Sequence, residues 1–172
     1  SVTGRSKERM GLHPFSSFIV SATMVHPDNR GSVRIKGPDT AVAPEIRFNY
    51  FVSERDQHAC VVALQTIRKL MSMPAIAHYV AEEMSPGPLC ISEADLVEFC
   101  RKRGNTNHHQ VGTCKMGVDG EAVVDPKLRV RGIAGLRVID ASIMPTIVGG
   151  NTNAATVMIA EKGSAMMLED AA

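Results

Sequence analysis

Alternation of apolar and polar positions near the start of the chain predicts β-structure. Residues 16–25 mix β-branched and bulky apolar side chains with Ser and Thr, as strands do. Residues 26–31 contain Pro, Asp, Asn and Gly, which favour a turn, and residues 32–36 alternate strictly between polar and apolar side chains. We therefore expect an antiparallel hairpin over these segments. Residues 45–50 alternate in the same way and predict a further strand.

The next stretch has the apolar spacing of a helix. Ser53 is a candidate N-cap, and Asp56 follows it in an arrangement similar to a capping box. Apolar residues then recur at helical positions until Pro74 stops the run. A shorter helix is expected over residues 76–83, before the Pro- and Gly-rich residues 85–88 break it.

Two further helices are predicted after this break. Ser92, with Asp95 behind it, caps an amphipathic helix that ends near Gly104. Residues 123–138 predict short strands around two glycines. Residues 152–168 predict a helix that is apolar nearly all round, so we expect it to be covered on most of its faces.

The composition is that of a globular protein. The chain has 172 residues, about the length of one domain, with 44% hydrophobic residues and a formal net charge of +1. Its one basic cluster, residues 101–103, does not amount to the charge pattern of a nucleic-acid binder. No apolar run reaches the ~18 residues of a membrane span, and the polar residues 1–5 do not resemble a signal peptide. We expect a cytoplasmic location, and because the sequence lacks an initiator Met we also expect a fragment of a longer protein.

Cysteine usage argues against a disulfide framework or a zinc site. The domain is large enough to bury a core without disulfides, so we expect buried thiols in a reducing compartment. A zinc site built from Cys100, His108, His109 and Cys114 matches no common ligand spacing and is not expected. The four cysteines have no CxxC spacing and are Cys60, Cys90, Cys100 and Cys114.

Two polar segments stand out from the core pattern. The first, residues 107–117, combines adjacent histidines with an amide and glycines in a predicted loop, where ligand-facing groups often lie. Histidine exchanges protons near neutral pH, although two solvated loop histidines explain the same residues equally well.

The second segment runs from an apolar strand at residues 136–139 through Asp140 and a Pro-bounded loop to Gly149-Gly150, just before the last helix. Paired glycines let backbone approach a ligand, and free N–H groups at a helix start attract electron-rich oxygens. Asn151, Thr152 and Asn153 are also candidate helix caps, and chemistry alone favours that interpretation.

Taken together, the segments form an ordered signature. The blocks H-x-x-G-T-C-x-M-G, V-V-D-x-x-L-R-V, G-L-R-V-I-D-A-S-I-M-P and G-N-T-N-A-A-T-V-M-I-A-E-K occur in that order. This order resembles the C-terminal part of the glucose–methanol–choline (GMC) family of flavin oxidoreductases, and most closely its choline dehydrogenase-like members. Residues 30–33, 48–50 and 83–87 also fit that branch, so the resemblance extends from about Phe15 to the end of the chain.

The resemblance implies two catalytic residues. His109, the first residue of the H-x-x-G-T-C block, matches the family's active-site histidine, the acid/base for the substrate hydroxyl. Asn151 matches the second catalytic position, which orients the substrate oxygen while a hydride leaves carbon for flavin N5. His108 lies where the family requires no histidine and is expected to be only a neighbour.

The resemblance also implies cofactor contacts, with FAD as the cofactor. Asp140 and Ala141 match the pair whose backbone lies against the flavin nucleotide. Thr152 and Asn153 match the helix start whose N–H groups face the flavin's pyrimidine edge. No metal site is implied.

The G-x-G-x-x-G motif that binds the ADP half of FAD in this family is missing from the sequence. We therefore expect the C-terminal portion of an FAD-dependent alcohol dehydrogenase or oxidase acting on CH–OH donors, inactive and without tightly bound FAD on its own. Residues 1–138 are expected to form the substrate-binding domain with the catalytic histidine loop, and residues 139–172 to return to the FAD-binding domain. The implied fold is α+β, a mainly antiparallel sheet with helices packed on one side and the terminal helix docked on that domain.

The expected partners are a small-molecule primary alcohol and the N-terminal FAD-binding part, with self-association through an uncovered terminal helix. Two alternatives stay open: a hydroxynitrile lyase of the same fold, and a non-catalytic domain that binds a partner. Glu82 and Glu83 are either attractors of a cationic substrate such as choline or solvated residues near a helix end.

Overall fold

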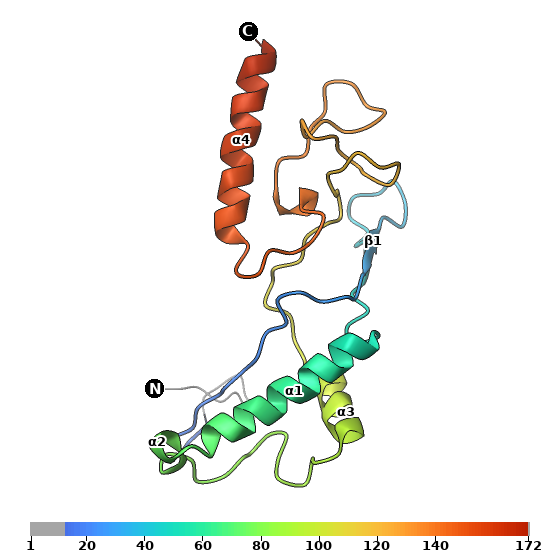
Figure 1. The fold of residues 1–172 in the computed structure, drawn as a ribbon. Helices are drawn as coiled ribbons and strands as arrows, with labels where there is room; N and C mark the ends of the chain where they lie inside the picture. Colours follow the sequence, from blue (N-terminus) through green and yellow to red (C-terminus); the bar gives the residue numbers. More distant parts are fainter. Residues whose placement is uncertain (1–12, 172) are drawn as a thin grey trace. The chain divides into compact units, whose positions relative to one another are not determined.

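The computed structural model describes residues 13–171, which form two compact units that we describe separately (Figure 1). The first unit contains residues 13–24 and Glu54–Arg103, and the second contains residues 25–53 and 104–171. The polar residues 1–5 lie outside the described residues. The functional division at residue 138 stays a prediction.

Three helices form the first unit: α1 (Glu54–Met71), α2 (Pro74–Ala77) and α3 (Glu93–Arg103). The helix expected after Ser53 and before Pro74 is confirmed. The helix expected over residues 76–83 is shorter and earlier than predicted. It ends because the following N–H groups bond three residues back, as in Tyr79 N–H to the Ile76 carbonyl at 2.9 Å, which tightens the turn.

Helix α3 begins at the predicted cap. Ser92 Oγ accepts a hydrogen bond from Asp95 N at 3.1 Å and donates one to Asp95 Oδ2 at 2.6 Å, so both residues act as the sequence indicates. Helices α1 and α3 pack on one another. The side chains buried on these two helices are Asp56, Cys60, Val61, Leu96 and Cys100.

In the second unit, the first strand pairs with a different segment from the one predicted. Strand β1 (Ser32–Arg34) pairs antiparallel with β2 (Glu45–Arg47), with Val33 opposite Ile46. The predicted hairpin of residues 16–25 with 32–36 is wrong, because residues 18–25 are irregular and β2 supplies the backbone partners. The α+β class is confirmed by this antiparallel pair and the four α-helices of the described residues.

The core of the second unit is built from loops, the 3-10 turn η1 (Ala141–Ile143) and helix α4 (Asn153–Ala171). The strands expected over residues 123–138 appear only as isolated bridges, such as Arg129 with Arg137. Backbone groups there are used in turns, for example Asp125 N to the Arg129 carbonyl at 3.0 Å. The buried core side chains are Val124, Leu128, Ile143, Met144 and Ile159.

Helix α4 is covered on one stripe. Ile159 and Gly163 are buried, and a Cβ added to Gly163 would lie 2.4 Å from Ile139 Cγ2, so the helix backbone lies directly on that side chain. The opposite face is open in this chain, with Met158 59% and Leu168 74% exposed. Within the described residues, no helix has both the length and the apolar character needed to cross a membrane.

Candidate active site

The two segments singled out by the sequence lie side by side in the second unit. Cys114 N donates to the Ser142 carbonyl at 3.0 Å, and Met116 N donates to the Ile143 carbonyl at 2.8 Å. These backbone hydrogen bonds join the histidine loop to η1. The loop is therefore held by main-chain pairing, which does not depend on the identity of its polar side chains.

Unusual backbone conformations shape this loop around His109. His108 has φ of 60°, and its N–H donates to Thr106 Oγ1 at 2.9 Å. Gly112 has φ of 93°, which glycine adopts without strain, and a Cβ there would lie 3.4 Å from the Met144 carbonyl oxygen. The His108 side chain is exposed, in keeping with its expected role as a neighbour only.

His109 reaches the start of α4. Its Nδ1 lies 3.0 Å from Thr152 Oγ1, and the Thr152 residue is only 8% exposed. Asn151 directly precedes Thr152 and is exposed. The imidazole of the first segment thus contacts the helix start of the second, although 43 residues separate the two hydrogen-bonded side chains along the chain.

Thr152 occupies the cap position of α4 without capping it through its side chain. Its carbonyl accepts the first helical hydrogen bond, from Thr156 N at 2.9 Å, while its hydroxyl is used on His109. Within the described structure, the N–H groups of residues 153–155 make no hydrogen bond. They are the free donors of a helix start, which attract electron-rich groups.

Asp140 and Ala141 have structural partners of their own. Asp140 caps η1, since its carboxylate accepts hydrogen bonds from Ser142 N at 2.7 Å and from Ser142 Oγ. Ala141 is partly buried and packs against the core. Both residues lie next to the backbone pairing that holds the histidine loop.

Two neighbours of the site were missed from sequence. Gln110 Nε2 donates to Tyr50 Oη at 3.1 Å, and the Tyr50 ring stacks on Phe48 with centroids 5.0 Å apart. A Cβ added to Gly149 would lie 3.2 Å from Nε2 of the exposed His26, so this glycine leaves room for that imidazole. Neither contact has a local signal, because both partners are distant in sequence.

Comparison with known proteins places this chain in a family. Residues 27–160 match the C-terminal part of GMC oxidoreductases. The chain belongs to the GMC oxidoreductase family. The resemblance stated from the sequence blocks is thereby confirmed.

Among GMC relatives, the chain is 49% identical to the oxygen-dependent choline dehydrogenase of Klebsiella pneumoniae subsp. pneumoniae over 134 residues, 78% of this chain and 24% of the relative. The same figures hold for the oxygen-dependent choline dehydrogenase of Escherichia coli O127:H6. The chain therefore spans about a quarter of the length of these relatives.

Solved structures of similar fold include an oxidase and an FAD-dependent oxidoreductase. Pyridoxine 4-oxidase from Mesorbium loti is 38% identical with a TM-score of 0.77, covering 82% of this chain and 28% of that protein. An FAD-dependent oxidoreductase from Chaetomium thermophilum is 25% identical with a TM-score of 0.79, covering 85% of this chain and 26% of that protein. These similarities agree with an α+β C-terminal domain.

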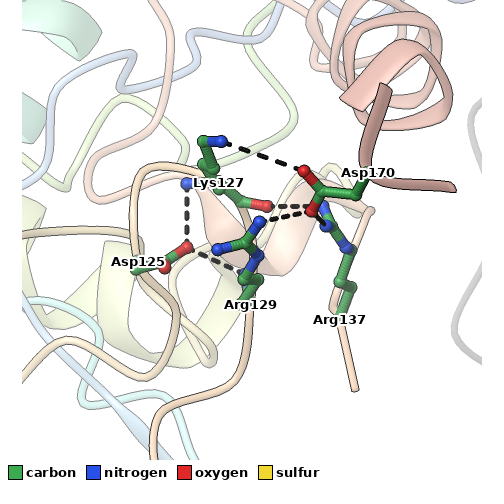
Figure 2. Close-up of polar contacts among 5 residues, drawn as sticks. All are labelled: Asp125, Lys127, Arg129, Arg137 and Asp170. Atoms are coloured by element: carbon green, nitrogen blue, oxygen red, sulfur yellow. Dashed lines mark hydrogen bonds and ion pairs between the residues drawn. The ribbon is translucent and has the colours of Figure 1, made fainter. Parts of the chain in front are cut away.

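In this GMC chain, ion pairs hold the C-terminal end of α4, away from the candidate site. Asp170 accepts hydrogen bonds from Arg129 and Arg137, and Lys127 Nζ lies 3.9 Å from its other oxygen (Figure 2). The hydrogen bond from Arg129 and the surrounding cations hold the pKa of Asp170 below its ordinary 3.8. Asp125 accepts from the backbone N–H groups of Lys127 and Arg129 at 2.8 and 3.0 Å, which orders the cationic loop.

The candidate attractor of a cationic substrate has another partner. Glu83 is partly buried and is not free, since its Oε1 lies 3.0 Å from Arg68 Nη2 in a forked ion pair. The same guanidinium donates to the carbonyls of Gly87 and Cys90 at 3.1 and 2.9 Å. Glu83 therefore helps to hold the loop between α2 and α3.

The cysteines of the first unit are reduced in this structure. Burial, and then a hydrogen bond with Cys60, raises the pKa of the Cys100 thiol to about 12, so it is a packing thiol and a poor nucleophile at neutral pH. Among residues 13–171, no group of three His, Cys, Asp or Glu side chains is placed to hold a metal ion.

Proposed function

We propose that the complete protein containing this chain is an FAD-dependent oxidoreductase that oxidises a primary alcohol of the choline class. The relatives that support this proposal carry the name oxygen-dependent choline dehydrogenase. The observation that supports it is the 3.0 Å hydrogen bond between His109 and Thr152, the residue that follows the exposed Asn151 in the chain. An imidazole can accept the proton of an alcohol, and an amide can donate a hydrogen bond to the oxygen that loses it.

Each proposed catalytic residue has one task. His109 accepts the proton of the substrate hydroxyl, and the Asn151 amide donates a hydrogen bond to the oxygen as negative charge develops there. When bound, FAD supplies the acceptor for the hydride that leaves the substrate carbon. The remaining groups position substrate and cofactor.

The proposed cofactor contacts lie around the start of α4. In this proposal the N–H groups at the helix start, at Thr152 and Asn153, face the negative charge that a reduced flavin carries, and the backbone at Asp140 and Ala141 lies against the cofactor. The rest of the FAD site belongs to the N-terminal part of the protein, since the sequence has no G-x-G-x-x-G motif. Residues 139–172 are proposed to return to that part and residues 1–138 to bind substrate.

The test is flavin reduction in the complete protein. Mixing it anaerobically with choline is expected to bleach the visible flavin absorbance, whereas a hydroxynitrile lyase would keep its flavin oxidised. His109→Ala and Asn151→Ala are each expected to slow the bleaching by roughly 10²- to 10⁴-fold, the usual size of general acid–base and oxyanion contributions. His108→Ala, the exposed neighbour, is the matched control and should leave the rate unchanged. A His109→Ala protein that is reduced at the original rate would refute the proposal.

A further inference from the structure

The two ring nitrogens of His109 are in different situations. Nδ1 is anchored to Thr152 Oγ1 at 3.0 Å, and within the described residues Nε2 makes no hydrogen bond. Because the nitrogens lie on different edges of the ring, anchoring Nδ1 on α4 directs Nε2 away from Thr152. Nε2 is therefore the nitrogen left for a ligand.

The Thr152 hydroxyl does not make the hydrogen bond that is usual for a threonine at the start of a helix. A threonine at a helix N-cap ordinarily accepts a hydrogen bond from an N–H of the first turn. Here its oxygen bonds to the imidazole, while its carbonyl is fixed by Thr156 N at 2.9 Å and Thr156 Oγ1 at 2.8 Å. Helix α4 therefore lacks a side-chain cap from Thr152, and the buried hydroxyl holds the His109 ring instead.

We propose that Thr152 is a positioning residue for His109: its Oγ1 accepts a hydrogen bond from Nδ1–H and so keeps the Nε2 lone pair free for the alcohol proton. This inference rests on the proposed function. In the step it serves, the O–H bond of the alcohol breaks, an Nε2–H bond forms, and the electron pair of the C–H bond leaves as hydride for FAD. A hydroxyl oxygen accepts from Nδ1–H in both the neutral ring and the imidazolium. Nothing at Nδ1 has to rearrange as Nε2 gains its proton.

The opposite polarity would have a different consequence. If the Thr152 hydroxyl donated to Nδ1, the neutral ring would carry its hydrogen on Nε2 and present a donor to the substrate. The two arrangements share the same distance between heavy atoms, so the tautomer distinguishes them.

The experiment measures that tautomer in the 172-residue chain. Long-range proton–nitrogen NMR spectra of the ¹⁵N-labelled chain report which nitrogen of the neutral His109 ring carries hydrogen, with His109→Gln identifying the signals. The wild type and Thr152→Ser are expected to show mainly Nδ1–H. Thr152→Val should lower the ratio of Nδ1–H to Nε2–H by roughly 2- to 10-fold, the factor that one net hydrogen bond represents. Thr156→Val, which removes a hydroxyl one turn later, is the matched control and should leave the ratio unchanged.

A wild-type ring that carries its hydrogen mainly on Nε2 would overturn the inference, as would an unchanged ratio in folded Thr152→Val. If Thr152→Val does not fold, the wild-type and Thr152→Ser spectra decide alone. Flavin reduction in the complete protein separates this inference from the proposed function. If His109→Ala is inactive and Thr152→Val alters neither tautomer nor rate, only the positioning role fails. If His109→Ala is fully active, the proposed function fails instead.

Discussion

Asp170 shows how single side chains compensate for an unfavourable position. It lies in the last turn of α4, where the helix dipole disfavours a carboxylate. Arg129 and Arg137 donate hydrogen bonds to it, and Lys127 adds a third positive charge, as Figure 2 shows. The lowered pKa of Asp170 records that the folded state favours the ionised form.

We expect Asp170→Asn to lower the free energy of unfolding at neutral pH and to reduce its acid dependence. Because the folded pKa lies below 3.8, the carboxylate stabilises the fold above about that pH, and this contribution is lost as the pH falls through the folded pKa. Urea unfolding at neutral pH and well below 3.8 measures both effects. Glu169→Gln removes an exposed charge next to it and is the control. Equal acid dependence in wild type and Asp170→Asn would contradict the prediction.

Thr152 and Asp140 also show why local chemistry alone misassigns some side chains. The sequence allows Thr152 to cap α4, and it does occupy the cap position, but its hydroxyl bonds to His109. Asp140 caps η1, which no pattern in the sequence indicated. The partner of Thr152 lies 43 residues away and depends on the path of the backbone, whereas the partner of Asp140, Ser142, lies only two residues on.

Helix α4 lies directly on the side chain of Ile139 at Gly163. Ile159 and Gly163 lie one turn apart on the buried stripe, and Asp170 continues that stripe toward the end of the helix. A glycine inside a helix ordinarily destabilises it by about 0.5–1 kcal/mol relative to alanine. Here the missing Cβ is what lets the helix lie on Ile139.

We therefore expect Gly163→Ala to destabilise the chain by about 1–3 kcal/mol, the usual cost of overpacking, in spite of the better helix propensity of alanine. The added Cβ would lie 2.4 Å from Ile139 Cγ2, an atom of a stiff β-branched side chain. Gly120→Ala is the matched control, since a Cβ there meets nothing within 4 Å. Thermal or urea unfolding measures the difference. A more stable Gly163→Ala variant would show that helix and Ile139 separate without cost.

The chain as a whole leaves apolar surfaces uncovered in both its sheet and its last helix. Val33 and Ile46 face one another across β1 and β2 and are about half exposed, and a two-stranded sheet is marginal without a covering layer. Val157, Met158 and Leu168 are exposed on α4. A chain that spans about a quarter of its relatives is expected to cover these faces with the rest of the protein.

We expect the isolated chain to self-associate through the open face of α4, because exposed apolar patches of this kind favour association. Leu168→Glu should shift the chain toward monomer, as measured by sedimentation or light scattering at several concentrations. Ser164→Glu, one turn earlier and also exposed, adds the same charge without removing an apolar side chain and is the control. Equal association of wild type and Leu168→Glu would exclude this face as the contact.

Features with local causes were predictable from the order of the residues. The start of α3 at Ser92 and the end of α1 before Pro74 follow from capping and from proline's missing N–H, which act within one helical turn. The family blocks identified His109 and Asn151 as candidates because each block is continuous in sequence and can be recognised without the fold.

Other features needed the folded chain, because they join residues far apart. Strand β1 pairs with β2 rather than with residues 16–25, since alternation identifies a strand but not the partner that satisfies its backbone. The bond of His109 to Thr152 likewise arises only once η1 holds the histidine loop beside the start of α4. Hydrogen bonds and close packing act over a few ångströms in space, so these pairings exist only after the intervening chain has folded.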